Sequence, residues 1–401
     1  MNLLIEGIKN GTVIKTTGTK KLVIDGKSVN CPIYEIKLDN LYYNDQNDRI
    51  ATWISQYKAD HGVDSISRDD INSYNSIIQG FIQSSNPDKM KETMNNIGLF
   101  GQQEPGVVLA DGRIIDGNRR FTCLRELSKT HANCEYFDAV ILDKDYECNA
   151  KQIKMLELQI QIGKEARVDY NPIDRLVGIY RDVVENQLLT PDEYAKSTNQ
   201  KPSDVQKQIE LATLLSEFLD AIHAPGEFYI ARDLALDGPL NELYGVLKKI
   251  SDEDKREEIK YIVFTNLLVK PDKDMTRFVR KLKAIVNGHY LDEFIERESE
   301  LSEEVLDGLP DKVSSTDVNE VRANETVRDD LKSAMDLIDN KVKAAETRNK
   351  PNQVLSKAVD SIEGIDNKII RKLTEEQQLD ILDNVEQLEE LLKSIRECLD
   401  V

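Results

Sequence analysis

The chain has 401 residues, 31% of them charged and 40% hydrophobic, and a formal net charge of -20 at pH 7. Its length predicts two or three domains, and its composition indicates a folded, helix-rich protein rather than a disordered one. So acidic a chain is not a general nucleic-acid binder, because non-specific binding depends on neutralising phosphates. A DNA-binding face, if present, must therefore be local.

No apolar stretch approaches the length of a membrane span, and Glu6 interrupts the start of the chain, where a secretion signal would stay apolar. We therefore expect a cytoplasmic protein with no membrane partner. The five cysteines are scattered without a Cys-x-x-Cys pair, and the four histidines are isolated. This pattern predicts neither a disulfide framework nor a metal site.

The first part of the chain, residues 1–150, mixes strand and helix patterns. Short β-rich runs predict strands at 13–16, 21–24 and 29–36, with Asp25-Gly26 as a hairpin turn. Helical spacing then follows at 50–57, 69–82 and 87–98.

A second hairpin is predicted further along. The apolar run 107–109 is followed by the turn dipeptide Asp111-Gly112 and by a return strand at 114–115. A helix at 121–129 and a strand at 138–142 complete this part, which we interpret as an α+β domain.

The rest of the chain has almost only helical patterns, and we divide it into a helical domain at 151–295, an acidic linker at 296–325 and a helical tail at 326–401. The helices expected in the middle part lie at 151–165, 172–188, 191–198, 202–223, 239–250 and 274–286.

The run from Asp111 to Arg120 is the strongest candidate for a binding site. The hairpin delivers the chain to Gly117, which permits a sharp turn and a close approach by a ligand. A helix begins directly afterwards, and its free N–H groups favour an anion. Arg119 and Arg120 oppose the helix dipole there, a cost that a bound phosphate would offset. The alternative is a plain turn whose arginines pair with internal acids such as Asp116.

Three segments in order resemble boxes of the ParB family. Residues 117–124 resemble its Gly-Glu-Arg-Arg box and the following helix, and 98–108 resemble its glycine-rich Gln-Pro box. Residues 41–49 resemble its opening Asn-Pro-Arg segment, with Asp48 where proline is usual. The chain is thereby similar to the ParB/sulfiredoxin superfamily over roughly residues 34–145.

This resemblance implies an α+β nucleotide-binding domain, an all-α domain with a helix-turn-helix, and a helical tail. It further implies a nucleoside triphosphate ligand, CTP favoured, with Mg²⁺, and a DNA-binding homodimer active in partition, transcription control, a mobile element or phage defence. The nucleotide-binding residues that it implies are Arg49, Gly101, Gln102, Gln103, Asp116, Gly117, Asn118, Arg119 and Arg120.

The sequence also departs from the family. Asn118 stands where the ParB box has a glutamate linked to hydrolysis, and an amide cannot act as a general base. The family's third box is degraded at 156–164. We therefore expect nucleotide binding without turnover, which leaves enzymatic activity open.

Two alternative functions are consistent with the same residues. A nuclease or nucleotide-dependent kinase of the same fold could hold a metal with Asp116, Glu104 and Asp111. A scaffold with a vestigial pocket would act only through protein partners that bind its acidic C-terminal helices.

Residues 169–176 resemble the start of the ParB central domain, and a helix-turn-helix pattern follows. Thr190 caps a helix at 191–198, and Pro202 starts the next one after a short turn. The DNA-facing residues predicted from this pattern are Lys201, Ser203, Gln206 and Lys207. Because Asp204 and Glu210 make the surface nearly neutral, a plain helical hairpin is the alternative.

Two further surfaces stand out. One predicted helix carries a second basic group, which could equally be an ordinary solvated face, formed by Arg277, Arg280, Lys281 and Lys283. The tail carries an apolar seam with three- and four-residue spacing, formed by Leu382, Val385, Leu388, Leu392, Ile395 and Leu399. The seam predicts a coiled-coil dimer, with packing against 327–345 of the same chain as the alternative.

Overall fold

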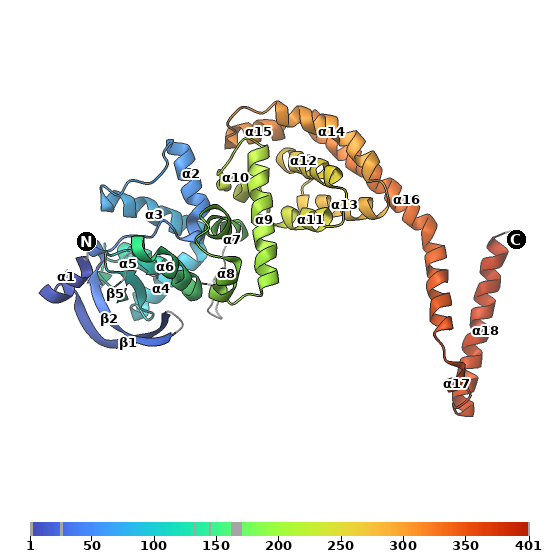
Figure 1. Ribbon diagram of the computed structural model, residues 1–401, viewed down its shortest axis with the longest axis horizontal. Helices are drawn as coiled ribbons and strands as arrows, with labels where there is room; N and C mark the ends of the chain where they lie inside the picture. The colour runs from blue at the N-terminus through green and yellow to red at the C-terminus, as the bar shows by residue number, and fades with distance from the viewer. Residues whose placement is uncertain (1–2, 25–26, 132–133, 144–145, 162–170, 400–401) are drawn as a thin grey trace. The chain divides into compact units, whose positions relative to one another are not determined.

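The computed structural model describes residues 3–24, 27–131, 134–143, 146–161 and 171–399. The chain forms two compact units, Met1–Asp339 and Asn340–Val401 (Figure 1). None of the helices in the described ranges has both the length and the apolar character needed to cross a membrane.

The larger unit begins with a mixed five-stranded sheet in the order β1-β2-β5-β3-β4. β3 and β5 run parallel, and the other neighbours are antiparallel. The strands are β1 (Ile14–Ile24), β2 (Lys27–Lys37), β3 (Gly106–Leu109), β4 (Ile114–Asp116) and β5 (Tyr136–Leu142). The two short strands expected at 13–16 and 21–24 are one strand, β1, whose register shifts between Lys15 and Thr19. The predicted turn at 25–26 lies outside the described residues.

Helices cover both faces of the sheet, because successive apolar residues along a strand direct their side chains to opposite faces. Val108 and Ile114 face a core with α3 (Ile71–Ser85), α4 (Pro87–Phe100) and α5 (Asn118–Leu127), whereas Val107 and Ile115 face α6 (Tyr146–Gln161). The hairpin predicted at Asp111-Gly112 is confirmed, since β3 and β4 pair across it. Together with α1 (Leu3–Asn10) and α2 (Ala51–His61), these elements confirm an α+β fold for the first part.

The described residues after the sheet are almost entirely helical, as expected. The helix predicted at 172–188 is α7 (Pro172–Ile179) continued by a π-helical turn, Tyr180–Glu185. The next five helices are α8 (Pro191–Thr198), α9 (Pro202–Ala221), α10 (Phe228–Asp233), α11 (Asp237–Leu247) and α12 (Glu253–Val269). The remaining ones are α13 (Met275–Asn287), α14 (Leu291–Asp307), α15 (Ser315–Ala323), α16 (Glu325–Glu363), α17 (Asn367–Ile370) and α18 (Glu375–Cys398). The sequence patterns missed α10 and α12.

The helices after residue 150 pack on α2. The backbone N–H of Thr52 donates to Asp174 Oδ1 of α7 at 2.9 Å. Arg232 of α10 donates to Gln56 Oε1 at 2.8 Å and lies 4.2 Å from the Trp53 ring centroid. These contacts explain why the first compact unit continues to Asp339.

The segment 296–325, expected to be an acidic linker, is mostly helical. Phe294, Glu298 and Ser302 of α14 recur every four residues and are buried, and Val318 of α15 is buried as well. Apart from Glu298, the acidic residues of α14 therefore occupy the outer face of an amphipathic helix, which composition alone did not distinguish from a linker.

The smaller unit contains the end of α16 together with α17 and α18. Each of the six seam residues from Leu382 to Leu399 is more than a third exposed. The apolar face of the 327–345 segment is already used elsewhere, because Leu331, Met335 and Ile338 are buried within the larger unit. The seam thus has no cover inside its own unit.

Glu298 is a fully buried carboxyl between α12 and α14. Its Oε2 accepts a hydrogen bond of 2.6 Å from Asn266 Nδ2, and its Oε1 has no partner among the described residues. Burial raises the pKa of Glu298 to about 8, because the charged form would lose its hydration.

Stability should therefore depend on the ionisation of Glu298. The pKa of about 8 in the folded state exceeds the ordinary glutamate value of 4.5. The stability that neutral Glu298 contributes is fully present below the pKa of the unfolded state. It is lost as the pH rises toward and through the pKa of the folded state, with roughly 3 kcal/mol lost by pH 7. We expect the melting temperature of Glu298→Gln, relative to the wild type, to rise between pH 5 and pH 8. The exposed Glu300→Gln is the control, and parallel pH profiles for wild type and Glu298→Gln would contradict the assignment.

Candidate functional site

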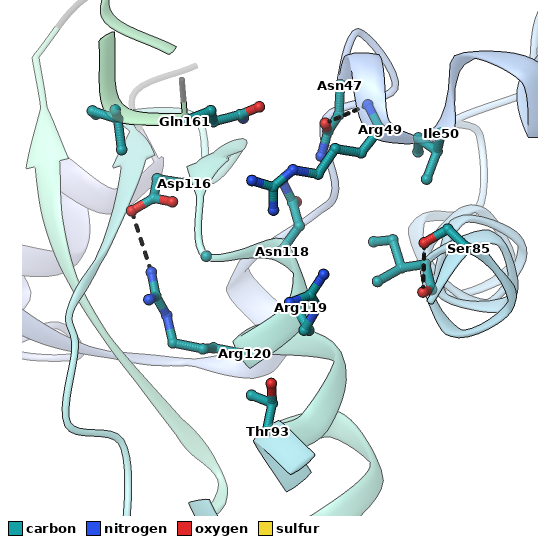
Figure 2. Close-up of a pocket in the computed structure, with 13 residues that line it drawn as sticks. Asn47, Arg49, Ile50, Ser85, Thr93, Asp116, Asn118, Arg119, Arg120 and Gln161 are labelled. Carbon is teal, nitrogen blue, oxygen red and sulfur yellow. Dashed lines mark hydrogen bonds and ion pairs between the residues drawn. The ribbon is translucent and has the colours of Figure 1, made fainter. Parts of the chain in front are cut away.

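A cavity of about 270 Å³ opens where α5 begins. Its walls come from the 3-10 turn Asp48–Ile50 with Asn47 before it, from α3 and α4, from the turn after β4 with the start of α5, and from the end of α6. Figure 2 shows Arg49, Asn118 and Arg119 directed toward the same space. The fold thus brings together the predicted residues Arg49 and 116–120, although Arg49 is far away in the sequence.

Gly117 makes this geometry possible. Its φ of 103° lies in the left-handed region, and a Cβ atom there would approach Phe137 Cζ to 2.8 Å. Gly117 is the N-cap of α5 and provides no capping side chain. The N–H groups of the first turn of α5 therefore lack a side-chain cap and face the cavity end of the helix.

The cavity is locally positive in an acidic protein. Three arginines line it, Arg49, Arg119 and Arg120, against one carboxylate, Asp116. Arg120 pairs with Asp116 at 3.2 Å, as Figure 2 shows, whereas the described part of the chain contains no ion pair for Arg119. Burial and the nearby charge of Arg49 lower the pKa of Arg119. An anion in the cavity would relieve this repulsion.

Asn118 supplies a second polar group. The residue is 7% exposed and lines the cavity, yet its Oδ1 has no hydrogen-bond partner among the described residues. Buried polar atoms are normally paired, so an unpaired one in a cavity indicates a group that a ligand or water satisfies.

The predicted residues Gly101, Gln102 and Gln103 lie outside the cavity lining. Gln102 braces the sheet instead: its amide donates to Asp138 O at 2.8 Å and accepts from Asp138 N at 2.9 Å. Gln103 donates to Phe100 O, and Gly101 ends α4 with a positive φ. The side-chain amides of Gln102 and Gln103 thus hold the loop.

The three acids proposed for a metal do not form one group. Asp116 and Glu104 share Lys20 of β1, at 3.5 and 3.8 Å, whereas Asp111 accepts a hydrogen bond from Tyr42 at 2.6 Å. Within the described ranges no group of three or more His, Cys, Asp or Glu is placed to hold a metal ion. The sequence reading missed Lys20, because no local pattern links β1 to the end of β4.

A buried ionic cluster lies behind the cavity. Lys154 of α6 contacts Asp48 at 2.9 Å, Asp182 at 3.1 Å and Glu157 at 3.9 Å, and Arg181 also pairs with Asp48. Burial opposes the charge on Lys154, but the carboxylates raise its pKa. Burial also raises the pKa of Glu157, which favours its neutral form. Burial raises the pKa of Asp182 as well.

The cluster adjoins the cavity wall at two points. Asp48 is the direct neighbour of Arg49, and Glu157 accepts a bond of 3.1 Å from Gln161, which lines the cavity. Gly178 of α7 lies so close to Asp48 that a Cβ there would approach its Cγ to 2.6 Å. The cluster thus fixes the cavity wall against α6, α7 and the π-helical turn.

Two helices, α8 and α9, lie where the helix-turn-helix was predicted and are joined by a turn at Asn199, whose φ is 52°. Thr190 forms the expected cap, and Val205 is buried. The four predicted DNA-facing residues, Lys201, Ser203, Gln206 and Lys207, are all exposed.

The second basic group on α13 is largely neutralised. Arg280 and Lys283 pair with Glu242, and Lys281 pairs with Asp336 at 2.8 Å. Three of its four cations therefore belong to internal ion pairs, which favours an ordinary helix face.

No family model matches the chain, and no curated protein is significantly similar to it. Among solved structures, one that the chain is similar to is described as "Structure of the C2221 form of Pnob8-like ParB-N domain". The match has 10% identity and a TM-score of 0.30 over 80% of this chain and 100% of that one. At this TM-score the likeness carries no weight for fold or function.

The buried cluster makes a clear prediction for stability. Lys154→Met leaves buried carboxylates without their central cation, and we expect a loss of about 3–5 kcal/mol. The matched control on the same helix is Lys151→Met, whose partner Glu193 is partly exposed, with an expected loss under about 1 kcal/mol. Equal losses in thermal or urea unfolding would contradict the importance of the cluster.

Proposed function

We propose that this chain is a ParB-like DNA-binding protein that binds a nucleoside triphosphate, CTP favoured, with Mg²⁺ at the cavity before α5. The observation that carries the proposal is the convergence of Arg49, Arg119 and Arg120 on an uncapped helix N-terminus. Guanidinium groups and free N–H groups are the donors that phosphate oxygens prefer.

The cavity suits the phosphates better than a whole nucleotide. Its volume of about 270 Å³ lies just below the range common for small-molecule sites. In this proposal the phosphates enter the cavity, and the sugar and base lie toward its mouth.

Binding without turnover follows from Asn118. Its amide can orient a phosphate or a water, but it cannot remove a proton at neutral pH. The nucleotide would then act as a ligand that changes the protein's association with DNA, rather than as a substrate.

The proposed DNA-binding surface is the start of α9, with the exposed residues Lys201, Ser203, Gln206 and Lys207. Lysines there would hold phosphates, and Gln206 could read a base edge in the major groove. Because Asp204 and Glu210 offset the lysines, we expect weak, salt-sensitive binding to arbitrary DNA.

We also propose that the chain forms a homodimer through the seam on α18. The seam residues from Leu382 to Leu399 follow one another at steps of three or four, as in a coiled coil, and are exposed in their own unit. A second copy offers the same stripe, and sedimentation of the full chain measures this association directly.

The nucleotide proposal predicts the behaviour of Arg119→Ala. Removing a charged hydrogen-bond donor should weaken CTP binding by about tenfold to a hundredfold in calorimetry with Mg²⁺. Lys129→Ala, at an exposed position in the turn after α5, should bind as the wild type does. Wild-type chain should release no phosphate from bound CTP. If CTP, ATP and GTP all fail to bind, the proposal is wrong.

The DNA proposal predicts a change in salt dependence. Lys207→Ala should weaken binding to a random-sequence duplex and reduce the slope of log affinity against log salt by about one. Lys273→Ala removes the same charge from an exposed position outside α9 and should leave both quantities unchanged. An identical slope for Lys207→Ala and wild type would exclude α9 as the phosphate-contacting surface.

A further inference from the structure

A second cavity, of about 460 Å³, lies between α12 and α14, away from the arginines of the first. Ala221, the last residue of α9, and His223, which follows that helix, complete its wall. Its size falls in the range of small-molecule sites.

The charge of this cavity is opposite to that of the first. Four carboxylates line it, Glu257 and Glu258 from α12 and Glu303 and Asp307 from α14, and no lysine or arginine is among the lining residues. Glu257 pairs with Lys260 at 2.6 Å, but the described ranges contain no ion pair for the other three. A ligand for this site must therefore bring positive charge.

A buried polar atom in the wall points to a hydrogen-bonding ligand. Ser302 lines the cavity and is 3% exposed, yet its Oγ has no hydrogen-bond partner among the described residues. A hydroxyl oxygen can accept a hydrogen bond from a donor group of a ligand.

The cavity also has apolar walls. Ile262 and Leu306 line it from the two helices, and the Tyr261 ring, 46% exposed, lines it as well. These side chains suit a methylene stem, and the Lys260 ammonium already lies 5.6 Å from the Tyr261 ring centroid. Metal ions carry no such stem, so the combination favours an organic cation.

We propose that this cavity binds an alkylammonium group on an aliphatic stem, as in a diamine or the side chain of lysine. The ammonium carries three donors and no acceptor, which matches the carboxylates and the Ser302 hydroxyl. The stem packs against Ile262, Leu306 and Tyr261. This inference is independent of the nucleotide proposal, because the two sites share no lining residue.

Titration calorimetry of the full chain with cadaverine at constant ionic strength tests the proposal. We expect saturable binding of one equivalent, at least tenfold weaker in the double variant Glu258→Gln and Glu303→Gln. The matched control is Glu389→Gln with Glu390→Gln, which removes the same charge from exposed positions of α18. Ser302→Ala should also weaken binding, because it removes the buried hydroxyl without changing the charge.

A second arm distinguishes the source of the ammonium group. A short peptide whose only charged side chain is a central lysine is titrated in parallel with cadaverine. Tighter peptide binding identifies a partner protein's lysine as the ligand, and tighter cadaverine binding identifies a free amine. Three results would overturn the proposal: no saturation by either probe, equal weakening in the control variant, or displacement of cadaverine by MgCl₂ at matched ionic strength, which would indicate a general ion atmosphere.

Discussion

The ion pairs of Lys154 join parts of the larger unit that lie far apart in the sequence. Lys154 is 3% exposed, and its carboxylate partners come from the turn at Asp48, from α6 itself and from the π-helical turn. A buried charge is tolerated only while its partners stay in place, because each ion has given up its hydration. The cluster therefore requires the sheet-based part and the helices to keep one relative position, and the contacts of α2 with α7 and α10 agree with that requirement.

The same constraint shapes the first cavity. Asp48 faces the buried cluster while its neighbour Arg49 faces the cavity, so one 3-10 turn serves both. The sheet positions the other wall, because β4 ends at Asp116 and Gly117 turns the chain directly into α5. A cationic cavity can persist in a chain of charge -20 because its arginines are held by these rigid elements. The cavity between α12 and α14, by contrast, is lined by four carboxylates.

Local patterns predicted much of the fold. Asp111-Gly112 specified the β3–β4 hairpin, and Thr190 and Pro202 specified the starts of α8 and α9, because turns and caps depend on a few adjacent residues. An amphipathic helix with a dense acidic face is harder to predict from sequence, and α14 lies in a segment that was expected to be a linker. The site was found only in part. The run from Asp116 to Arg120 lines the cavity as expected, but Gln102 and Gln103 hold the loop instead.

What the sequence by itself determined is local: the strands, turns and helix starts, the glycine at 117, and the apolar seam of α18. Only the tertiary structure decided which charges meet. Lys20 reaches Asp116 across 96 positions, and Lys154 reaches Asp48 across 106. No spacing rule encodes such pairs, because their geometry depends on how the sheet and helices pack. The same holds for the cationic cavity and the acidic one, whose walls come from elements that are neighbours only in the folded chain.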